Sequence, residues 1–145
     1  MKIIFLDVDG VLNCQGDFKG KSLHVLNKDM IARLDKIKEA TGAKVVLIST
    51  WRKFRKHRDY LKKNGVKFID RTIDFCLPPS ERYGQRGAEI EHWLNKRPDI
   101  KKYVIIDDEW DFLEYQRPLL VKTQWLVGMQ DEHVEQAINI LKKGM

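Results

Sequence analysis

The sequence predicts a three-layer α/β domain with a mainly parallel, five-stranded sheet. Short apolar runs rich in branched residues alternate along the chain with segments whose apolar residues repeat at helical spacing, as in successive βαβ units. The chain has 145 residues and 43% hydrophobic content, which is enough for one compact core, so we expect residues 1–145 to form a single domain. No apolar window reaches the length of a membrane span, and we expect no contact with a membrane.

Five apolar runs are predicted to be strands. Each is short and bounded by turn-forming or charged residues, a pattern typical of strands buried on both faces of a parallel sheet. The runs are Lys2–Leu6, Lys44–Ile48, Val66–Ile69, Tyr103–Ile106 and Leu119–Val121. Because ligands of open parallel sheets bind beyond the carboxyl ends of the strands, the residues that follow these runs are the first candidates for a functional site.

Four segments carry apolar residues at helical spacing and are predicted to be helices. A side-chain N-cap before the first, a glycine after it, and acids at the start and lysines at the end of the last agree with the preferences of helix ends. The segments lie between Asn27 and Gly42, across Trp51, Phe54 and Leu61, from about Gly87 to Asn95, and from Asp131 to Lys143.

The net charge of +6 is concentrated in one segment. Residues 52–63, RKFRKHRDYLKK, contain seven Lys or Arg and one acid, so the rest of the chain sums to zero. Clustered positive charge favours a polyanionic partner such as nucleic acid, because phosphate contacts release condensed counterions. The alternative is that this segment is the solvated face of a helix.

The cysteines, the histidines and the N-terminus indicate no export and no zinc site. The N-terminus meets charge too early for a signal peptide, and Cys14 and Cys76 are too far apart for a CxxC pair. We therefore expect a cytoplasmic protein with reduced thiols. The four histidines lack ligand spacing and are expected to be ordinary core or surface residues; they are His24, His57, His92 and His133.

Acidic and hydroxyl side chains follow three of the predicted strands. They are Asp7 and Asp9 after the first strand, Ser49 and Thr50 after the second, and Asp107, Asp108 and Asp111 after the fourth. In a parallel sheet these ends meet at one edge, where crowded carboxylates repel one another unless a cation lies among them. Because Mg²⁺ prefers oxygen ligands, the sequence predicts a Mg²⁺ site there. For the first acid pair alone, the alternative is an ordinary polar strand end.

The same strand ends resemble the motifs of a known family. FLDVDGVLN, at residues 5–13, resembles the first motif of the haloacid dehalogenase (HAD) superfamily of phosphohydrolases, an apolar strand followed by DxDG. KVVLIST, at residues 44–50, resembles the second motif, and YVIIDDEWD, at residues 103–111, resembles the fourth. Arg86 has the place of the third motif, a basic residue before a helix, with Arg82 as the alternative.

Three further segments are similar to one subgroup of that superfamily, the HAD domains of Swiss Army Knife RNA repair proteins. The segments are STWR (49–52), RGAEIEHWL (86–94) and GMQDEHVEQAINIL (128–141). The resemblance implies a Rossmann-like HAD fold. It also implies a phosphatase of the kind grouped with RNA repair proteins, with RNA and DNA both open as the substrate.

The resemblance implies a chemical role for each site residue. Asp7 would attack phosphorus and form an aspartyl-phosphate, and Asp9 would act as general acid toward the leaving oxygen and then as general base toward water. Ser49, with Thr50 beside it, would bind a phosphoryl oxygen, and Arg86 would supply positive charge to the phosphoryl group.

The resemblance also implies a set of Mg²⁺ ligands. The Asp7 and Asp108 side chains and the Asp9 backbone carbonyl would hold the cation, with Asp107 and Asp111 as outer or alternative ligands.

The segments in which HAD relatives carry cap domains, residues 13–27 and 64–85, are too short to hold one. The site is therefore expected to be open, which suits a phosphate at the end of a polymer. Loop residues Lys19 and Lys21 would add charge above the pocket or be solvated.

We expect Arg52 and Arg55, which begin the basic segment, to lie at the mouth of the site and guide a polynucleotide backbone. Trp51, Tyr83 and Trp110 are candidates to stack on a base, although packing is favoured for Trp51.

The leading hypothesis is a Mg²⁺-dependent phosphomonoesterase that removes terminal phosphate from nucleic-acid ends. One alternative is a phosphatase for a small metabolite or nucleotide. Another is a catalytically silent nucleic-acid-binding module, which is disfavoured because every expected catalytic position holds a competent residue.

Overall fold

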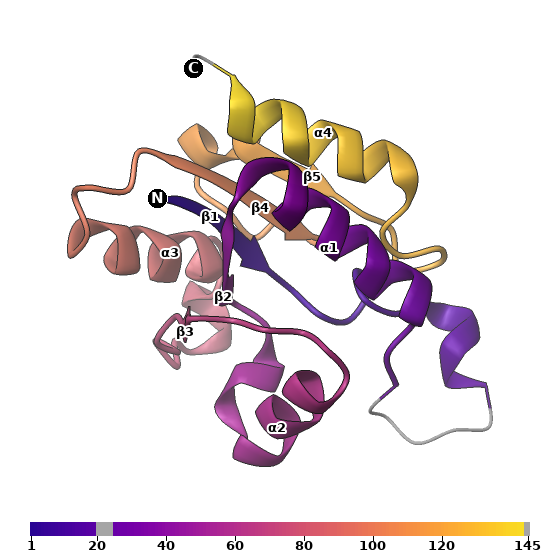
Figure 1. Ribbon diagram of the computed structural model, residues 1–145. Helices are drawn as coiled ribbons and strands as arrows, with labels where there is room; N and C mark the ends of the chain where they lie inside the picture. The colour runs from indigo at the N-terminus through magenta and orange to yellow at the C-terminus, as the bar shows by residue number, and fades with distance from the viewer. Residues whose placement is uncertain (20–24, 144–145) are drawn as a thin grey trace.

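The computed structural model describes residues 1–19 and 25–143 and confirms the predicted α/β fold class (Figure 1). The sequence predictions for Lys21 and His24 fall outside these residues. The strands form one parallel sheet in the order β3-β2-β1-β4-β5. They are β1 (Lys2–Leu6), β2 (Lys44–Leu47), β3 (Asp70–Arg71), β4 (Lys102–Asp107) and β5 (Leu120–Lys122). The α-helices are α1 (Lys28–Thr41), α2 (Arg55–Lys63), α3 (Gln85–Asn95) and α4 (Asp131–Lys142).

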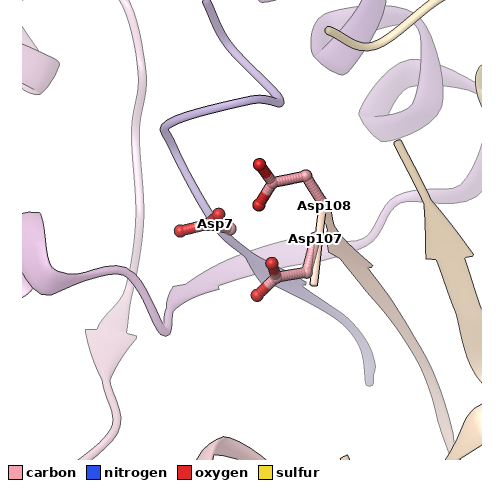
Figure 2. A group of neighbouring side chains, drawn as sticks. All are labelled: Asp7, Asp107 and Asp108. Carbon is pink, nitrogen blue, oxygen red and sulfur yellow. The ribbon is translucent and has the colours of Figure 1, made fainter. Parts of the chain in front are cut away.

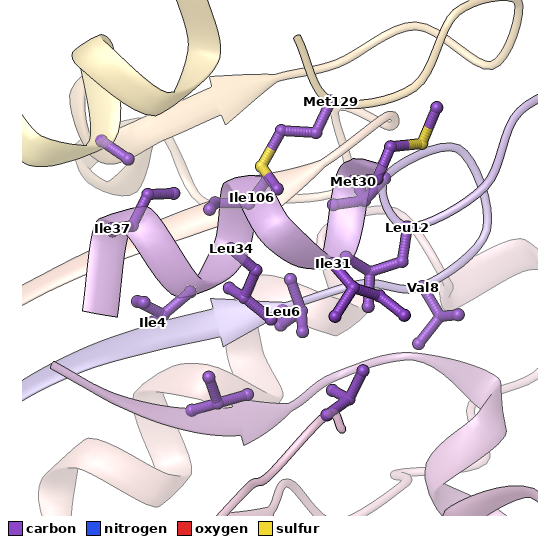
Figure 3. Packing of buried hydrophobic residues seen from close by; sticks show 14 of the residues in the cluster. Ile4, Leu6, Val8, Leu12, Met30, Ile31, Leu34, Ile37, Ile106 and Met129 are labelled. Carbon is purple, nitrogen blue, oxygen red and sulfur yellow. The ribbon is translucent and has the colours of Figure 1, made fainter. Parts of the chain in front are cut away.

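Helices cover both faces of the sheet and bury its central strand. Figure 1 shows α1 and α4 side by side on one face and α3 on the other. Ile4 and Leu6 of β1 pack under α1, as Figure 3 shows, whereas Ile3 and Phe5 pack on the α3 side. All four side chains are fully buried. The carboxyl end of β1 is therefore held firmly from both sides.

The ends of α1 confirm the predicted caps. The side-chain oxygen of Asn27 accepts hydrogen bonds from the backbone N–H groups of Asp29 and Met30. At the other end, Gly42 adopts a left-handed conformation with φ 73° and donates its N–H to Lys38.

Two predicted elements differ from the structure. The run Val66–Ile69 is not a strand, because the chain first bonds to β2 at the N–H of Ile69 and the ladder pairs only Asp70 and Arg71. The second predicted helix is interrupted at Phe54, which is extended and 56% exposed, between a 3₁₀ turn at Thr50–Lys53 and α2. A helix face formed by Trp51, Phe54 and Leu61 was therefore a wrong prediction.

The described part of the chain forms no cap domain over the carboxyl edge of the sheet. None of its helices has the length and apolar character needed to cross a membrane.

The start of α3 is docked on the segment that follows β4. The Gly87 N–H donates to the carbonyl of Asp111 at 3.0 Å, and the buried side chain of Gln116 donates to the carbonyl of Gly87 at 2.9 Å. A Cβ at position 87 would lie 2.6 Å from the backbone nitrogen of Leu113. Only glycine lets the two segments approach this closely.

We predict that Gly87→Ala lowers the free energy of unfolding by about 1–3 kcal/mol, because the added methyl group overpacks a rigid backbone contact. Gly16→Ala is the matched control, since a Cβ there meets nothing within 4 Å, and it should be nearly neutral. Urea denaturation of the two variants measures the difference. Equal effects would contradict the close docking of α3.

Candidate active site

Three carboxylates gather at the carboxyl ends of β1 and β4 (Figure 2). Asp107 ends β4, Asp108 follows it, and Asp7 follows β1 in the neighbouring position of the sheet. One carboxylate oxygen from each of the three lies within 4.8 Å of those of the other two. Asp7 and Asp107 are buried and Asp108 is partly buried. The sequence prediction that these strand ends converge is confirmed.

One guanidinium group reaches two of these carboxylates. The Nη1 atom of Arg86, in the first turn of α3, lies 2.6 Å from Oδ2 of Asp107 and 3.3 Å from Oδ1 of Asp7. Arg82, the alternative from the sequence, instead donates its Nε–H to the carbonyl of Leu77 on an exposed loop. The structure thus brings Arg86, and not Arg82, to the acids.

The cluster carries more negative charge than Arg86 offsets. Burial, with the neighbouring charge of Asp107, raises the pKa of Asp7 well above its ordinary value, although Arg86 acts in the opposite direction. Burial and Asp107 also raise the pKa of Asp108 to about 6. Burial alone would lower the pKa of Arg86, but Asp7 and Asp107 raise it overall. A compact, buried set of oxygen donors with excess negative charge fits a hard divalent cation.

Asp9 lies apart from this group, and two side chains hold it. Asn13 donates from Nδ2 to Oδ1 of Asp9 at 2.9 Å, and Trp51 donates from Nε1 to Oδ2 at 3.2 Å. Asn13 is fully buried and also accepts the N–H of Gly10 at 2.9 Å and donates to the carbonyl of Val25. These two hydrogen bonds hold the Asp9 side chain outside the group of gathered carboxylates.

Sequence reasoning missed Asn13 and the polar role of Trp51. Trp51 is buried, as expected, but its ring nitrogen is also the partner of Asp9. The sequence did carry a signal for Asn13, because an asparagine four residues after Asp9 is close enough along the chain to form hydrogen bonds with that loop.

Gly10 brings the loop after β1 close to Asp108. Its φ is 81°, and a Cβ there would lie 2.2 Å from Oδ2 of Asp108. The carbonyl of Gly10 accepts the hydroxyl of the buried Thr123 at 2.6 Å. The position therefore requires glycine both for its conformation and for its packing against a candidate metal ligand.

Ser49 and Thr50 lie at the end of β2, beside the acids. Ser49 is 1% exposed and its Oγ accepts the N–H of Trp51 at 3.1 Å. A hydroxyl that accepts in this way can still donate its hydrogen to a phosphoryl oxygen. Thr50 is exposed and lines two clefts that open at this edge of the sheet.

Arg52 is one of the residues that line the cleft beside Arg86, but most of its side chain is enclosed by the protein. Its side chain is 5% exposed, and its guanidinium donates to the carbonyls of Ile48, Ser49 and Thr72 and forms an ion pair with Glu89 at 3.2 Å. Burial lowers its pKa, and Glu89 partly offsets that effect. Arg52 ties β2 to the segment after β3 and to α3, so its donors are not presented to a polynucleotide.

Of the remaining candidates, Arg55 lies on the surface of α2 and Asp111 lies at the start of α3. Arg55, in the first turn of α2, is 88% exposed and lies 3.8 Å from Asp59. Asp111 lies outside the gathered carboxylates, because its two oxygens accept the N–H groups of Gly84 and Arg86 and cap α3.

A parallel sheet with these groups at its carboxyl edge defines a HAD-type domain, a class of phosphatase-type hydrolases that generally use a divalent metal. Residues 3–134 match the family described as "HAD domain in Swiss Army Knife RNA repair proteins", and the chain belongs to that family. The resemblance inferred from the sequence motifs is confirmed. No curated protein matches the chain.

We predict that Glu89→Gln lowers the free energy of unfolding by about 3 kcal/mol, because it leaves Arg52 buried without its counter-charge. Arg55→Ala breaks only an exposed ion pair and should change stability by less than about 0.5 kcal/mol. Urea denaturation compares the two variants. A small effect of Glu89→Gln would mean that the buried ion pair does not form.

We predict that a divalent cation raises the melting temperature of the wild type by about 4 °C or more at saturating concentration. Asp108→Asn should remove most of this increase, since it removes one of the three gathered carboxylates. Without the cation, the same variant should melt above the wild type, because the amide relieves repulsion with Asp7 and Asp107. Glu109→Gln, an exposed neighbour, serves as control. An unchanged cation response in Asp108→Asn would contradict the assigned site.

Proposed function

We propose that this chain is a Mg²⁺-dependent phosphomonoesterase that removes a terminal phosphate from a polynucleotide. The observation that carries the proposal is the separation of two carboxylates at the end of β1. Asp7 lies among the metal-binding acids with Arg86 3.3 Å away, whereas Asp9 is turned aside by Asn13 and Trp51. Such a pair supplies a nucleophile and a proton donor on opposite sides of one phosphoryl group.

In the first step, an Asp7 carboxylate oxygen bonds to phosphorus while the bond between phosphorus and the leaving oxygen breaks. Asp9 delivers its proton to the leaving oxygen, so the products are an aspartyl-phosphate on Asp7 and a free hydroxyl group. Arg86 orients Asp7 and offsets charge on the phosphoryl oxygens, with a hydrogen bond from Ser49.

In the second step, Asp9 accepts a proton from water as the water oxygen bonds to phosphorus. The bond from phosphorus to Asp7 breaks, which releases inorganic phosphate and restores both carboxyl groups. Asp7 and Asp108, with Asp107 and the Asp9 carbonyl as further ligands, would hold Mg²⁺, which would supply positive charge to the transferring phosphoryl group.

Two features support a polynucleotide as substrate, besides the RNA repair context of the family. First, a cleft of about 320 Å³ next to the gathered carboxylates is lined by four cations, Arg52, Lys53, Arg82 and Arg86, and by three acids, Asp74, Glu89 and Asp111. Glu89 is paired with Arg52 and Asp74 with Lys53, which leaves Arg82 and Arg86 as the main candidates to contact phosphate. Second, the exposed Arg55 and its basic neighbours on α2 offer further phosphate contacts.

The first experiment measures phosphate release from a 3′-phosphorylated oligonucleotide, a 5′-phosphorylated one, a nucleoside monophosphate and an aryl phosphate, with Mg²⁺ or with chelator. We expect the fastest release from one oligonucleotide end. Asp7→Asn should lower kcat by about 1000-fold or more, as expected for loss of a nucleophile, and chelator should abolish release. Asp59→Asn, an exposed acid on α2, should retain activity.

Each other outcome of this experiment is informative. Release from the two small substrates alone would replace the polynucleotide by a small metabolite as substrate. Release that survives in Asp7→Asn would refute the aspartyl-phosphate mechanism.

A further inference from the structure

A second cleft opens beside Asp9, and aromatic rings line most of it. Its volume is about 460 Å³, within the usual range for a small-molecule site. The rings belong to Phe18, Trp51, Phe54, His57 and Trp125. We call this the aromatic cleft.

The rings of the aromatic cleft come from three separate segments of the chain. Phe18 and Trp125 pack together with ring centroids 5.2 Å apart, and the backbone N–H of Gln15 donates to the carbonyl of Trp125. Phe54 meets His57 edge to face at 5.2 Å on another side of the cleft.

The packing of the core does not account for the most exposed of these rings. Phe54 is 56% exposed and Trp125 is 41% exposed, and neither belongs to the two hydrophobic clusters that flank the sheet. Exposed aromatic surface that converges on one hollow is typical of a binding site.

The position of Asp9 indicates what binds there, and this step rests on the proposed function. Asp9 lines the aromatic cleft and not the charged cleft beside Arg86, and Thr50 lies between the two because it lines both. The proton from Asp9 goes to the oxygen that leaves phosphorus. The organic group attached to that oxygen must therefore lie next to Asp9, in the aromatic cleft.

We infer that the aromatic cleft binds the nucleoside that carries the phosphate, with its base stacked on Phe54 and Trp125. Every base presents a flat π-face, so aromatic side chains hold bases without reading their sequence. Tyr83 and Trp110, two of the stacking candidates from the sequence, do not line this cleft.

Charge complementarity favours the end of a nucleic-acid strand as the occupant. The aromatic cleft shares His57 with a groove on α2 that is also lined by Lys56, Asp59, Tyr60 and Lys63. Two lysines and one acid leave this groove with a net positive charge beside an aromatic ring, as in surfaces that follow a single strand. The terminal nucleoside occupies the aromatic cleft, and the adjoining nucleotides lie along α2.

The experiment compares two oligonucleotides with the same terminal phosphate, one with a base and one abasic at the terminal residue. For the wild type, we expect kcat/KM to be at least about 10-fold higher with the base. Phe54→Ala and Trp125→Ala should each reduce this preference to about 3-fold or less and leave turnover of the abasic substrate within about 2-fold of wild type. Tyr83→Ala, which removes a ring that is 82% exposed outside the cleft, should keep the full preference.

Phe54→Leu and Trp125→Leu distinguish the loss of the ring from a folding defect, since leucine keeps most of the apolar volume but has no ring. They should melt near the wild-type temperature and still lose the base preference. An unchanged preference in these variants, or an equal loss on both substrates, overturns the inference.

Binding of the unphosphorylated forms of both oligonucleotides, measured by fluorescence anisotropy, separates this inference from the proposed function. If the wild type releases no phosphate but binds the base-bearing strand more tightly in a manner that needs Phe54 and Trp125, the nucleoside site stands and the proposed reaction fails. If phosphate is released with no preference for the base and the two strands bind equally, the reaction stands and the nucleoside site is refuted.

Discussion

The balance of buried charge at the carboxyl ends of β1 and β4 is the constraint on which the site depends. Three carboxylates gather there, and the two that are buried, Asp7 and Asp107, share one guanidinium, that of Arg86. Such an arrangement is stable only if surrounding groups hold it or further positive charge arrives. Burial of β1 on both faces fixes Asp7, and the close approach of Gly10 fixes Asp108.

The position of Arg86 in turn depends on how α3 begins. Asp111 caps the first turn of α3, and Gly87 and Gln116 bind that turn to the segment after β4. Asp111, which the sequence predicted as an outer or alternative metal ligand, therefore affects the site by positioning α3, the helix that carries Arg86. The same helix carries Glu89, which forms an ion pair with the buried Arg52, so α3 takes part both in the carboxylate cluster and in a buried ion pair that ties it to β2.

The strand ends were predictable because their signals are local. The apolar run before Asp7, the run before Asp107 and the parallel register fix where these acids meet. Arg52 was not predictable, because its burial depends on Glu89, 37 positions away, and on backbone carbonyls. The aromatic cleft was also missed, since its rings come from segments separated by most of the chain. The position of Phe54 was predicted wrongly, because its spacing of three residues from Trp51 is typical of a helix face. In the structure the helix is interrupted at Phe54, and its ring is exposed.

Asn13 makes the loop after β1 sensitive to the replacement of a single atom. Its oxygen must accept from Gly10 and its nitrogen must donate to Asp9 and Val25, so the amide fits in one orientation only. A carboxylate has nearly the same shape, but it would turn both donated hydrogen bonds into oxygen–oxygen repulsions, one of them against Asp9. The turn therefore discriminates between isosteric side chains, and conversion of this amide to an acid would disorder the Asp9 side chain without changing the outline of the protein.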